Sequence, residues 1–369
     1  MSDKLTVLII GCGRVAVKHV KALKTLKDTY TLAGLCDANK AAAEKLIASQ
    51  GLSKDIRIFD DYKKAITELK PSVVAITLPS GLHHEAATFA MNNGSNILLE
   101  KPMAMSTAES RDIHETASRL GLKIAMGHIY RYLPIVGLLQ EDIAKGVYGK
   151  VTHGSIYVRW GHDDAYYDSA AWRGTWKADG GALMNQTIHA IDLLVWLMGS
   201  EPCEVESMIA RRKRNIEAED LGMAIMRLEN GALASIEGTT CTDPDRHMAM
   251  FTVFCDNATL SIGLNSGKPK MDLRLNGGKK LNGRYLRRQI SKYGLGYTVK
   301  SALNPHLGIY KNLAHSIINN EQPLADSYAG FSSVDTLMGI YRSAKEGRAV
   351  QLPLGDDFAS TDMADYIMP

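Results

Sequence analysis

Residues 5–16 read LTVLIIGCGRVA, an apolar run that passes directly into a GxGxxA turn. The run has the length of one buried strand, and a helix-like stretch follows from Val15 to Leu26. In a strand–turn–helix of this kind, Gly11 permits the tight turn and Gly13 lets the main chain approach a pyrophosphate. A small third residue lets helix and strand pack closely. The stretch therefore predicts a dinucleotide-binding domain at the start of the chain.

An acidic residue, Asp37, ends the next apolar run, Leu32–Cys36. It follows Gly13 at close to the spacing of about 20 residues that is expected of a carboxylate binding the ribose 2′-hydroxyl. The same carboxylate would repel a 2′-phosphate. We therefore expect the cofactor to be NAD rather than NADP.

The bulk composition predicts a globular protein of two domains. The 369 residues are 45% hydrophobic and 22% charged, and the net charge of +3 is too small to indicate nucleic-acid binding. Five scattered cysteines without CxxC spacing favour free thiols in a reducing compartment, which we expect to be the cytoplasm, and argue against a metal site. Because no apolar run reaches the length of about 18 residues, no membrane span is expected.

Strand-like and helix-like stretches alternate over residues 1–126, which predicts a doubly wound parallel sheet with helices on both faces. Ligands of such sheets bind beyond the carboxyl ends of the strands. The residues that follow the strands are therefore the candidate cofactor contacts: Gly11, Cys12, Gly13, Arg14, Val15, Asp37, Pro79, His83, Glu100 and Lys101. For Pro79 and His83 the alternative is that they only begin a helix.

Residues 127–355 show long alternating runs joined by hairpin signals such as Asn230-Gly231, and a helix is expected over Asn185–Met198. This pattern predicts a second α/β domain with a large, open, mostly antiparallel sheet. Residues 268–300 are rich in Lys and Arg. We interpret them as a solvated loop, with a patch for an anionic substrate group or a neighbouring subunit as the alternative. Residues 356–369 form an acidic tail, either loose or docking a subunit.

Glu100-Lys101-Pro102 follows the predicted strand Asn96–Leu99. A lysine at this point is expected beside the nicotinamide, where its ammonium can hydrogen-bond a substrate hydroxyl and relay a proton. Pro102 restricts Lys101 to extended geometry and allows a cis peptide bond. The alternative is a surface lysine that ends a strand.

His189 lies four residues after Asn185, so the two share one face of the expected helix. That face offers a titratable imidazole beside an amide that can orient it or bind sugar hydroxyls. A lone helical histidine is most often structural, but a Gly-Gly turn and two tryptophans precede this one and favour a functional interpretation.

Four further side chains are candidates for binding the substrate. Trp172 and Arg173 can shape a sugar pocket, together with Trp176, because aromatic rings stack on pyranose faces; core packing explains the tryptophans equally well. Arg131, just past a predicted strand, can clamp a carboxylate or diphosphate, and a structural ion pair is its alternative.

These motifs together resemble the glucose–fructose oxidoreductase, inositol dehydrogenase and rhizopine catabolism (Gfo/Idh/MocA) family, over roughly residues 4 to 355. The markers are the GxGxxA turn, Pro79-Ser80-Gly81-Leu82-His83, Glu100-Lys101-Pro102, and Gly180-Gly181-Ala182-Leu183-Met184 leading to His189-Ala190-Ile191-Asp192. The stretches Trp-Arg-Gly-Thr-Trp and Asn-Gln resemble those of the subgroup of this family that acts on sugar nucleotides and related pyranosides.

The resemblance implies a Rossmann domain, a second domain with an open sheet, and a homodimer or homotetramer joined through that sheet. The family's catalytic lysine corresponds to Lys101 and its catalytic histidine to His189. Its common aspartate, four residues before the histidine, is Asn185 here.

We therefore expect an NAD-dependent dehydrogenase that oxidises a secondary ring hydroxyl of a sugar or sugar nucleotide, such as C3 of a UDP-linked uronic acid. Lys101 and His189 are the catalytic pair, and either can be the base. An inositol or free-sugar dehydrogenase is the nearest alternative. A glycoside-processing enzyme that recycles tightly bound NAD, or a non-catalytic NAD-binding sensor, is the alternative of another class.

Overall fold

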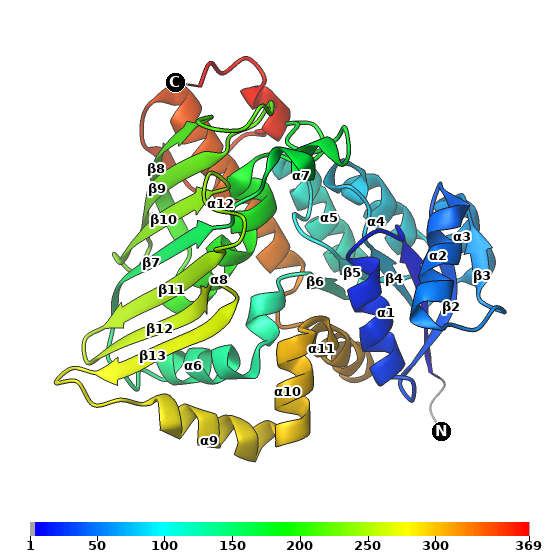
Figure 1. Ribbon diagram of the computed structural model, residues 1–369, viewed down its shortest axis with the longest axis horizontal. Coiled ribbons are helices and arrows are strands. Elements are labelled where there is room, and N and C mark those ends of the chain that lie inside the picture. The colour runs from blue at the N-terminus through cyan, green and yellow to red at the C-terminus, as the bar shows by residue number, and fades with distance from the viewer. Residues whose placement is uncertain (1–3, 369) are drawn as a thin grey trace. The chain divides into compact units, whose positions relative to one another are not determined.

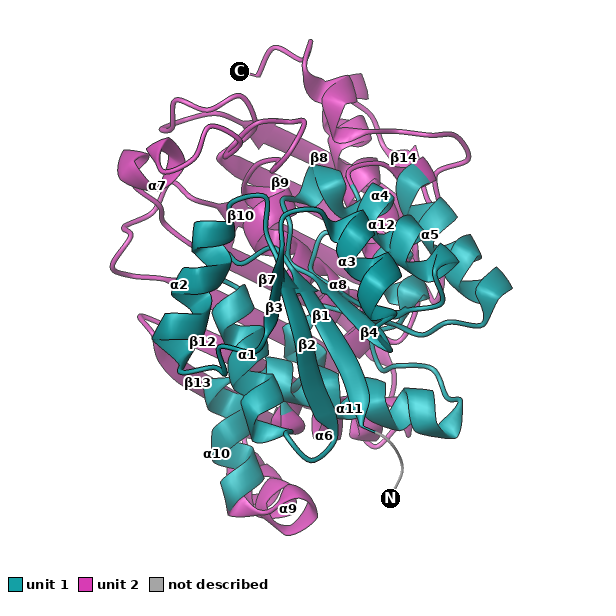
Figure 2. Ribbon diagram, turned by 90° about the vertical axis from the view of Figure 1, so that its right-hand side faces the viewer, with its two compact units in different colours: residues 1–104, 109–133, 296–331 teal, residues 105–108, 134–295, 332–369 magenta. Residues whose placement is uncertain are grey.

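The computed structural model describes residues 4–368, which form two compact units (Figure 2). One unit runs up to residue 104 and includes residues 109–133 and 296–331. The other holds residues 105–108, 134–295 and those from 332 onward. The domain bounds inferred from the sequence, at residues 126 and 355, rest on pattern rather than on compactness and stay a prediction.

The first unit is built on a parallel sheet of six strands in the order β3-β2-β1-β4-β5-β6 (Figure 1). The strands are β1 (Leu5–Ile10), β2 (Tyr30–Cys36), β3 (Arg57–Phe59), β4 (Val73–Ile76), β5 (Asn96–Leu99) and β6 (Ile124–Met126). Val7 to Ile10 are at most 1% exposed, as expected of a strand covered on both faces. The predicted parallel sheet is confirmed, although β3 is too short to show a pattern in the sequence.

Helices alternate with these strands. They are α1 (Ala16–Thr25), α2 (Lys40–Gln50), α3 (Tyr62–Leu69), α4 (His83–Asn92) and α5 (Thr107–Leu120), followed later in the chain by α10 (Leu295–Leu303) and α11 (His306–Asn319). Polar side chains begin two of them, because Asn39 accepts from the Ala41 amide at 3.2 Å and Asp61 from the Lys63 amide at 2.7 Å. α1 packs against α2 and α11, and α3 packs against α4.

The second unit contains a sheet of eight strands in the order β13-β12-β11-β7-β10-β9-β8-β14 (Figure 1). The strands are β7 (Val151–Arg159), β8 (Pro202–Ala210), β9 (Leu221–Leu228), β10 (Leu233–Thr239), β11 (Met248–Cys255), β12 (Ala258–Asn265), β13 (Lys268–Leu275) and β14 (Val350–Gln351). β7 and β10 pair in parallel, and the other neighbours pair antiparallel. The predicted mostly antiparallel sheet is confirmed.

Burial alternates along these strands, so the sheet has one buried face and one open face. In β9, Ala224 and Met226 are buried while Met223 and Ile225 are exposed. The helices of this unit are α6 (Pro134–Ala144), α7 (Asp164–Asp168), α8 (Ile188–Met198), α9 (Asn282–Tyr293) and α12 (Ser327–Glu346). α8 packs on the buried face, against β7 and β11.

Two expectations about the second half of the chain are corrected. Residues 268–300 are not a solvated loop: they form β13, α9 and most of α10, because apolar side chains such as Leu273 and Tyr285 are buried among the charges. Of the two alternatives for the acidic tail, the loose one is wrong, and docking of a subunit stays a prediction. Asp357 accepts from the Thr107 hydroxyl at 2.8 Å, and Ser360 donates to the Trp176 carbonyl at 2.6 Å.

Two absences bear on the class of protein. Within residues 4–368, no helix is both long and apolar enough to cross a membrane. The five cysteines are free thiols.

Candidate active site

The glycine turn after β1 is held in a conformation that only glycine accepts. Gly11 has a φ of +90°, and a Cβ on it would lie 2.5 Å from the Thr77 carbonyl oxygen. Its amide donates to the Cys36 carbonyl at 2.8 Å, and the Thr77 hydroxyl donates to its carbonyl at 2.6 Å. The turn is therefore fixed to the carboxyl ends of β2 and β4.

The surroundings of this turn fit a dinucleotide. Gly13 is exposed, and a Cβ built on it would meet nothing within 4 Å, which leaves the main chain open to a pyrophosphate. Asp37, half-buried at the end of β2, accepts from the Cys12 amide at 2.7 Å and from the Asn39 amide at 2.9 Å. A carboxylate has further acceptor capacity for a ribose hydroxyl. Burial, then the nearby Asp37, raises the pKa of the Cys12 thiol to about 12, so this thiol is inert.

His83 begins α4 and ties two main-chain segments together. It is 1% exposed, and its ring nitrogens lie 2.7 Å from the Pro102 carbonyl and 2.9 Å from the Leu78 carbonyl. Burial lowers the pKa of this imidazole. These contacts tie the main chain before Pro79 to the main chain after Lys101, and direct contact of His83 with the cofactor stays a prediction.

Glu100 is the centre of a buried cluster that sequence analysis missed. Its Oε1 lies 3.0 Å from Nε2 of both His19, on α1, and His306, on α11. Burial alone would raise the pKa of Glu100, but the two histidine hydrogen bonds hold it well below its usual range. The cluster fixes the residue that precedes Lys101, and the Lys101–Pro102 bond is cis, as the sequence allowed.

Asn185 and His189 lie at the start of the helix that packs on the second sheet. The helix begins with a π-helical turn over Leu183–Thr187 and continues as α8, a local widening that often marks functional sites. Between residues 181 and 190, Asn185, Gln186 and His189 are partly exposed, while the other residues are buried. Asn185 and His189 are thus partly exposed in a segment that is otherwise largely buried, and a shared face for their side chains stays a prediction.

Two paired glycines explain how this segment lies so close to the sheet. Gly222 of β9 and Gly238 of β10 are register partners. A Cβ on Gly222 would meet Leu183 at 2.5 Å, and one on Gly238 would meet Thr187 at 2.3 Å. Glycines inside strands mark close approach of another backbone, so this signal was present in the sequence.

Glu219 holds the amino end of the same segment. Its backbone carbonyl accepts from the Ala182 amide at 3.0 Å, and its Oε1 accepts from the Leu183 amide at 2.8 Å. The Tyr341 hydroxyl donates to the same oxygen at 3.0 Å. Burial raises the pKa of Glu219 to about 8. No local pattern in the sequence marks Glu219 as a site residue.

The aromatic candidates divide into core and surface. Trp176 is 2% exposed and packs edge-on against Tyr341, so it is a core residue. Trp172 and Arg173 are half-buried, and the Arg173 guanidinium lies 4.6 Å from the Trp172 ring and 4.2 Å from the Tyr166 ring. A sugar-binding role remains open for Trp172 and Arg173 and stays a prediction.

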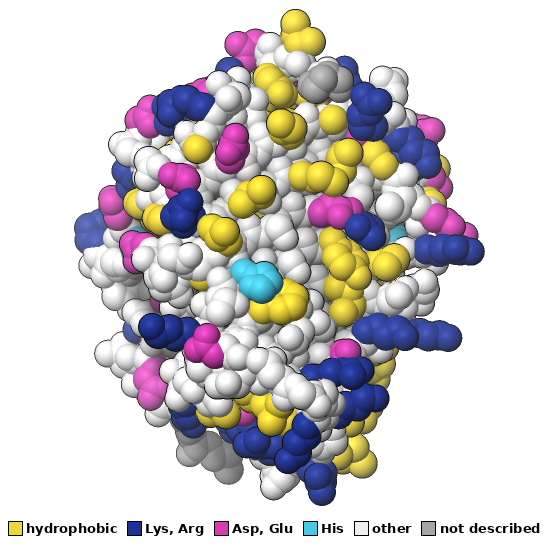
Figure 3. All heavy atoms as spheres, turned by 90° about the vertical axis from the view of Figure 1, so that its left-hand side faces the viewer, with side chains coloured by type: hydrophobic (Ala, Val, Ile, Leu, Met, Phe, Trp, Pro, Cys, Tyr) yellow, Lys and Arg dark blue, Asp and Glu magenta, His cyan; other side chains and the backbone are white. Residues whose placement is uncertain are grey.

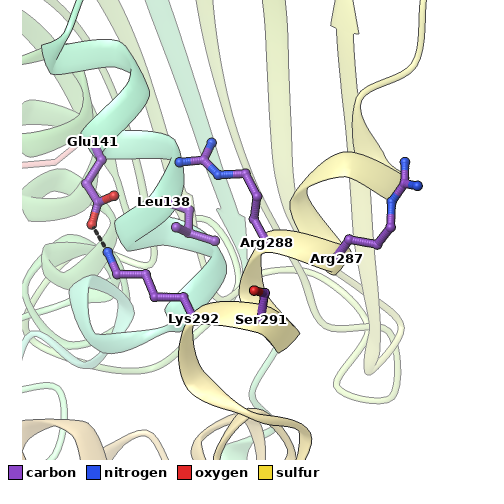
Figure 4. A pocket seen from close by; sticks show the side chains of 6 residues that line it. All are labelled: Leu138, Glu141, Arg287, Arg288, Ser291 and Lys292. Carbon is purple, nitrogen blue, oxygen red and sulfur yellow. Dashed lines mark hydrogen bonds and ion pairs between the residues drawn. The ribbon is translucent and has the colours of Figure 1, made fainter.

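Three of the cations proposed for anionic groups already have partners. Arg131 donates to the Leu324 carbonyl at 3.2 Å. On α9, a hollow of about 420 Å³ is lined by Leu138, Glu141, Arg287, Arg288, Ser291 and Lys292 (Figure 4). Lys292 pairs with Glu141, and Arg288 pairs with Asp142. These pairs reduce the positive charge that the hollow offers to a ligand.

A dinucleotide-binding unit and a unit with a large open sheet define the class of two-domain NAD-dependent oxidoreductases. Residues 5–128 match the oxidoreductase family with an NAD-binding Rossmann fold, and residues 137–261 match the GFO/IDH/MocA C-terminal domain. The chain belongs to this family, as the sequence motifs implied, and it is an NAD-dependent oxidoreductase.

Several relatives act on sugars. The chain is 29% identical to glucose-6-phosphate 3-dehydrogenase of Bacillus subtilis, over 64% of this chain and 68% of the relative. It is 23% identical to D-glucoside 3-dehydrogenase of Escherichia coli, over 95% and 98%. Among solved structures, the WlbA dehydrogenase of Bordetella pertussis in complex with NADH and UDP-GlcNAcA is similar, with a TM-score of 0.81, 28% identity, and coverage of 95% of this chain and 100% of that one.

Proposed function

We propose that this protein oxidises a secondary ring hydroxyl of a sugar nucleotide, namely C3 of a UDP-linked uronic acid, with NAD as the acceptor. The observation that carries the proposal is the segment 181–190, where Asn185 and His189, four residues apart, are partly exposed among mostly buried residues. Similarity along 95% of the chain to a dehydrogenase bound to UDP-GlcNAcA supports the substrate class.

Bound at the glycine turn, NAD⁺ would supply nicotinamide C4 as the hydride acceptor. Gly13 and Asp37 would hold the pyrophosphate and the ribose. His189 takes the hydroxyl proton while Lys101 polarises the oxygen, or the two exchange these roles. Each such acid–base group contributes about 10²–10⁴-fold to the rate.

The substrate is tested with purified enzyme, NAD⁺ and a panel of UDP-GlcNAcA, UDP-N-acetylglucosamine, glucose 6-phosphate and an inositol. We expect NADH absorbance with UDP-GlcNAcA. If the inositol were the only member of the panel that reduces NAD⁺, the enzyme would be a free-polyol dehydrogenase instead. NADH that stays on the protein through gel filtration would indicate a recycled cofactor, as in a glycoside-processing enzyme.

The catalytic pair is tested in the same assay with Lys101→Ala and His189→Ala. Each should lower kcat by about 10²–10⁴-fold while the fold is kept. Rates near the wild type in both variants would remove both residues from the mechanism. Lys177→Ala, at an exposed lysine, serves as a control and should leave kcat unchanged.

A homo-oligomer through the second sheet is the proposed assembly, and the cytoplasm stays the expected compartment. On the open face, Met208 is 81% exposed, Met223 51% and Ile225 63%, and Met208 pairs with Met223 across β8 and β9. Hydrophobic side chains gather on this face (Figure 3). An apolar sheet face of this kind is expected to be covered by a partner, here a second copy of the chain.

A further inference from the structure

Asp179 is a buried carboxylate fixed at both oxygens. It is 4% exposed. Its Oδ2 accepts from the Gly174 amide at 2.8 Å, and its Oδ1 accepts from Nδ2 of Asn185. The Asp179 amide donates in turn to the Thr175 carbonyl at 3.1 Å. The loop that ends in Gly180 therefore places one carboxylate oxygen against the side chain of Asn185.

This contact decides which end of the Asn185 amide is presented to a ligand. A carboxylate only accepts hydrogen bonds, so the Asn185 NH₂ group has to face Asp179. The Asn185 carbonyl oxygen, Oδ1, is then the other end of the amide. Because Asn185 is partly exposed, this oxygen is the end of the amide that can face a ligand.

We propose that Asp179 is a positioning residue that holds Asn185 as a hydrogen-bond acceptor for a substrate hydroxyl. The inference rests on the proposed function, since it assigns Asn185 a ligand among the hydroxyls of a sugar. Asp179 touches neither substrate nor cofactor in this account. Asp179 acts through the side-chain amide of Asn185. Without Asp179, that amide could turn either its NH₂ group or its oxygen to the substrate.

Single substitutions should disturb the pair in different ways. Asn185→Asp sets two carboxylates against each other, and we expect a loss in kcat/KM of about 10- to 100-fold. Lower pH should restore part of the loss, because one proton shared by the two carboxylates re-forms the hydrogen bond. In Asp179→Asn, the new amide turns its oxygen to the Gly174 amide and its NH₂ to residue 185. Asn185 then flips and offers NH₂ to the substrate, which should lower kcat/KM by about tenfold.

The exchange variant, which combines Asp179→Asn with Asn185→Asp, makes the decisive test. The amide introduced at position 179 donates to one oxygen of the carboxylate introduced at position 185, and the second oxygen of that carboxylate faces the substrate as an acceptor. We therefore expect kcat/KM within a few-fold of the wild type, far above either single variant. A merely structural contact would lower Tm in the single variants but leave the kcat/KM of their folded protein at the wild-type value. The proposal is overturned if the kcat/KM of the exchange variant does not exceed that of the less active single variant. It is also overturned if Asp179→Asn keeps the wild-type kcat/KM.

Thermal unfolding of the same four proteins separates this inference from the proposed function. Asn185→Asp should lower Tm, and the added Asp179→Asn should bring it back within about 3 °C of the wild type. Asp142→Asn is the matched control, because it removes a buried carboxylate that pairs with Tyr285 and Arg288 instead. It should lower Tm without changing kcat/KM. Wild-type protein that oxidises no member of the panel would refute the proposed substrate, while the Tm pattern would still decide the Asp179–Asn185 contact.

Discussion

Replacing Glu219 with glutamine should remove a loss of stability that the wild type suffers as the pH rises. Glu219 is 0% exposed, and its Oε1 accepts from the Leu183 amide and the Tyr341 hydroxyl. Burial raises its pKa from 4.5 to about 8. A glutamine is neutral at every pH and keeps an oxygen to accept from both donors, so it mimics the protonated acid.

The magnitude follows from linkage between the proton and folding. Because the pKa is raised in the folded protein, the stabilisation by the bound proton is complete below the unfolded value and is lost as the pH rises through about 8. A shift of this size corresponds to a loss of up to roughly 5 kcal/mol, at about 1.4 kcal/mol per pH unit. The difference in the free energy of unfolding, variant minus wild type, should therefore rise by several kcal/mol between pH about 4.5 and pH about 8.

Urea unfolding from acid to alkaline pH measures this effect, with tryptophan fluorescence as the signal. Buried Trp176, packed against Tyr341, reports the same unit. Glu229→Gln, at an exposed position of the same unit, is the control and should follow the wild type. If the free energies of unfolding of wild type and Glu219→Gln run parallel over the whole range, the reasoning about Glu219 is wrong.

Three further predictions concern the cofactor, the assembly and the buried cluster. Gly13→Ala should keep the wild-type Tm but raise the Kd for NADH at least about tenfold. Gly11→Ala should also lower Tm, because its Cβ would lie 2.5 Å from a carbonyl oxygen. Calorimetry with NADH measures both variants, and an unchanged Kd in Gly13→Ala would contradict the placement of the pyrophosphate. Ile225→Lys should halve or quarter the mass measured by light scattering while Tm and fold are retained, and an unchanged mass would move the interface elsewhere. Glu100→Gln should lower the free energy of unfolding at neutral pH by about 1–3 kcal/mol. Because the pKa of Glu100 is depressed, the wild type should also lose stability on acidification, and urea titrations that show the same acid loss in the variant would exclude Glu100 as its source.

Local patterns were enough to predict much of the fold, and the site residues to which they point stay predictions. The run before Gly11 and the alternation after residue 127 predicted both sheets, since buried and half-buried strands leave different sequence patterns. The spacing of Asn185 and His189 predicted that they share a helix face, and both residues are partly exposed. The prediction of a solvated loop over residues 268–300 was wrong, because the few apolar residues of this stretch, such as Leu273, stand among many charged ones and leave no clear periodic pattern.

The sequence by itself determined the glycine turn, the carboxylate that follows β2 and the family, because each depends on residues close together in the chain. Only the tertiary structure decided which side chains support them. Glu100 meets His19 and His306, and Glu219 holds the segment of Asn185, across separations that no local periodicity encodes. Such contacts depend on how strands and helices pack, and a buried carboxylate reveals its partners only when the chain is folded.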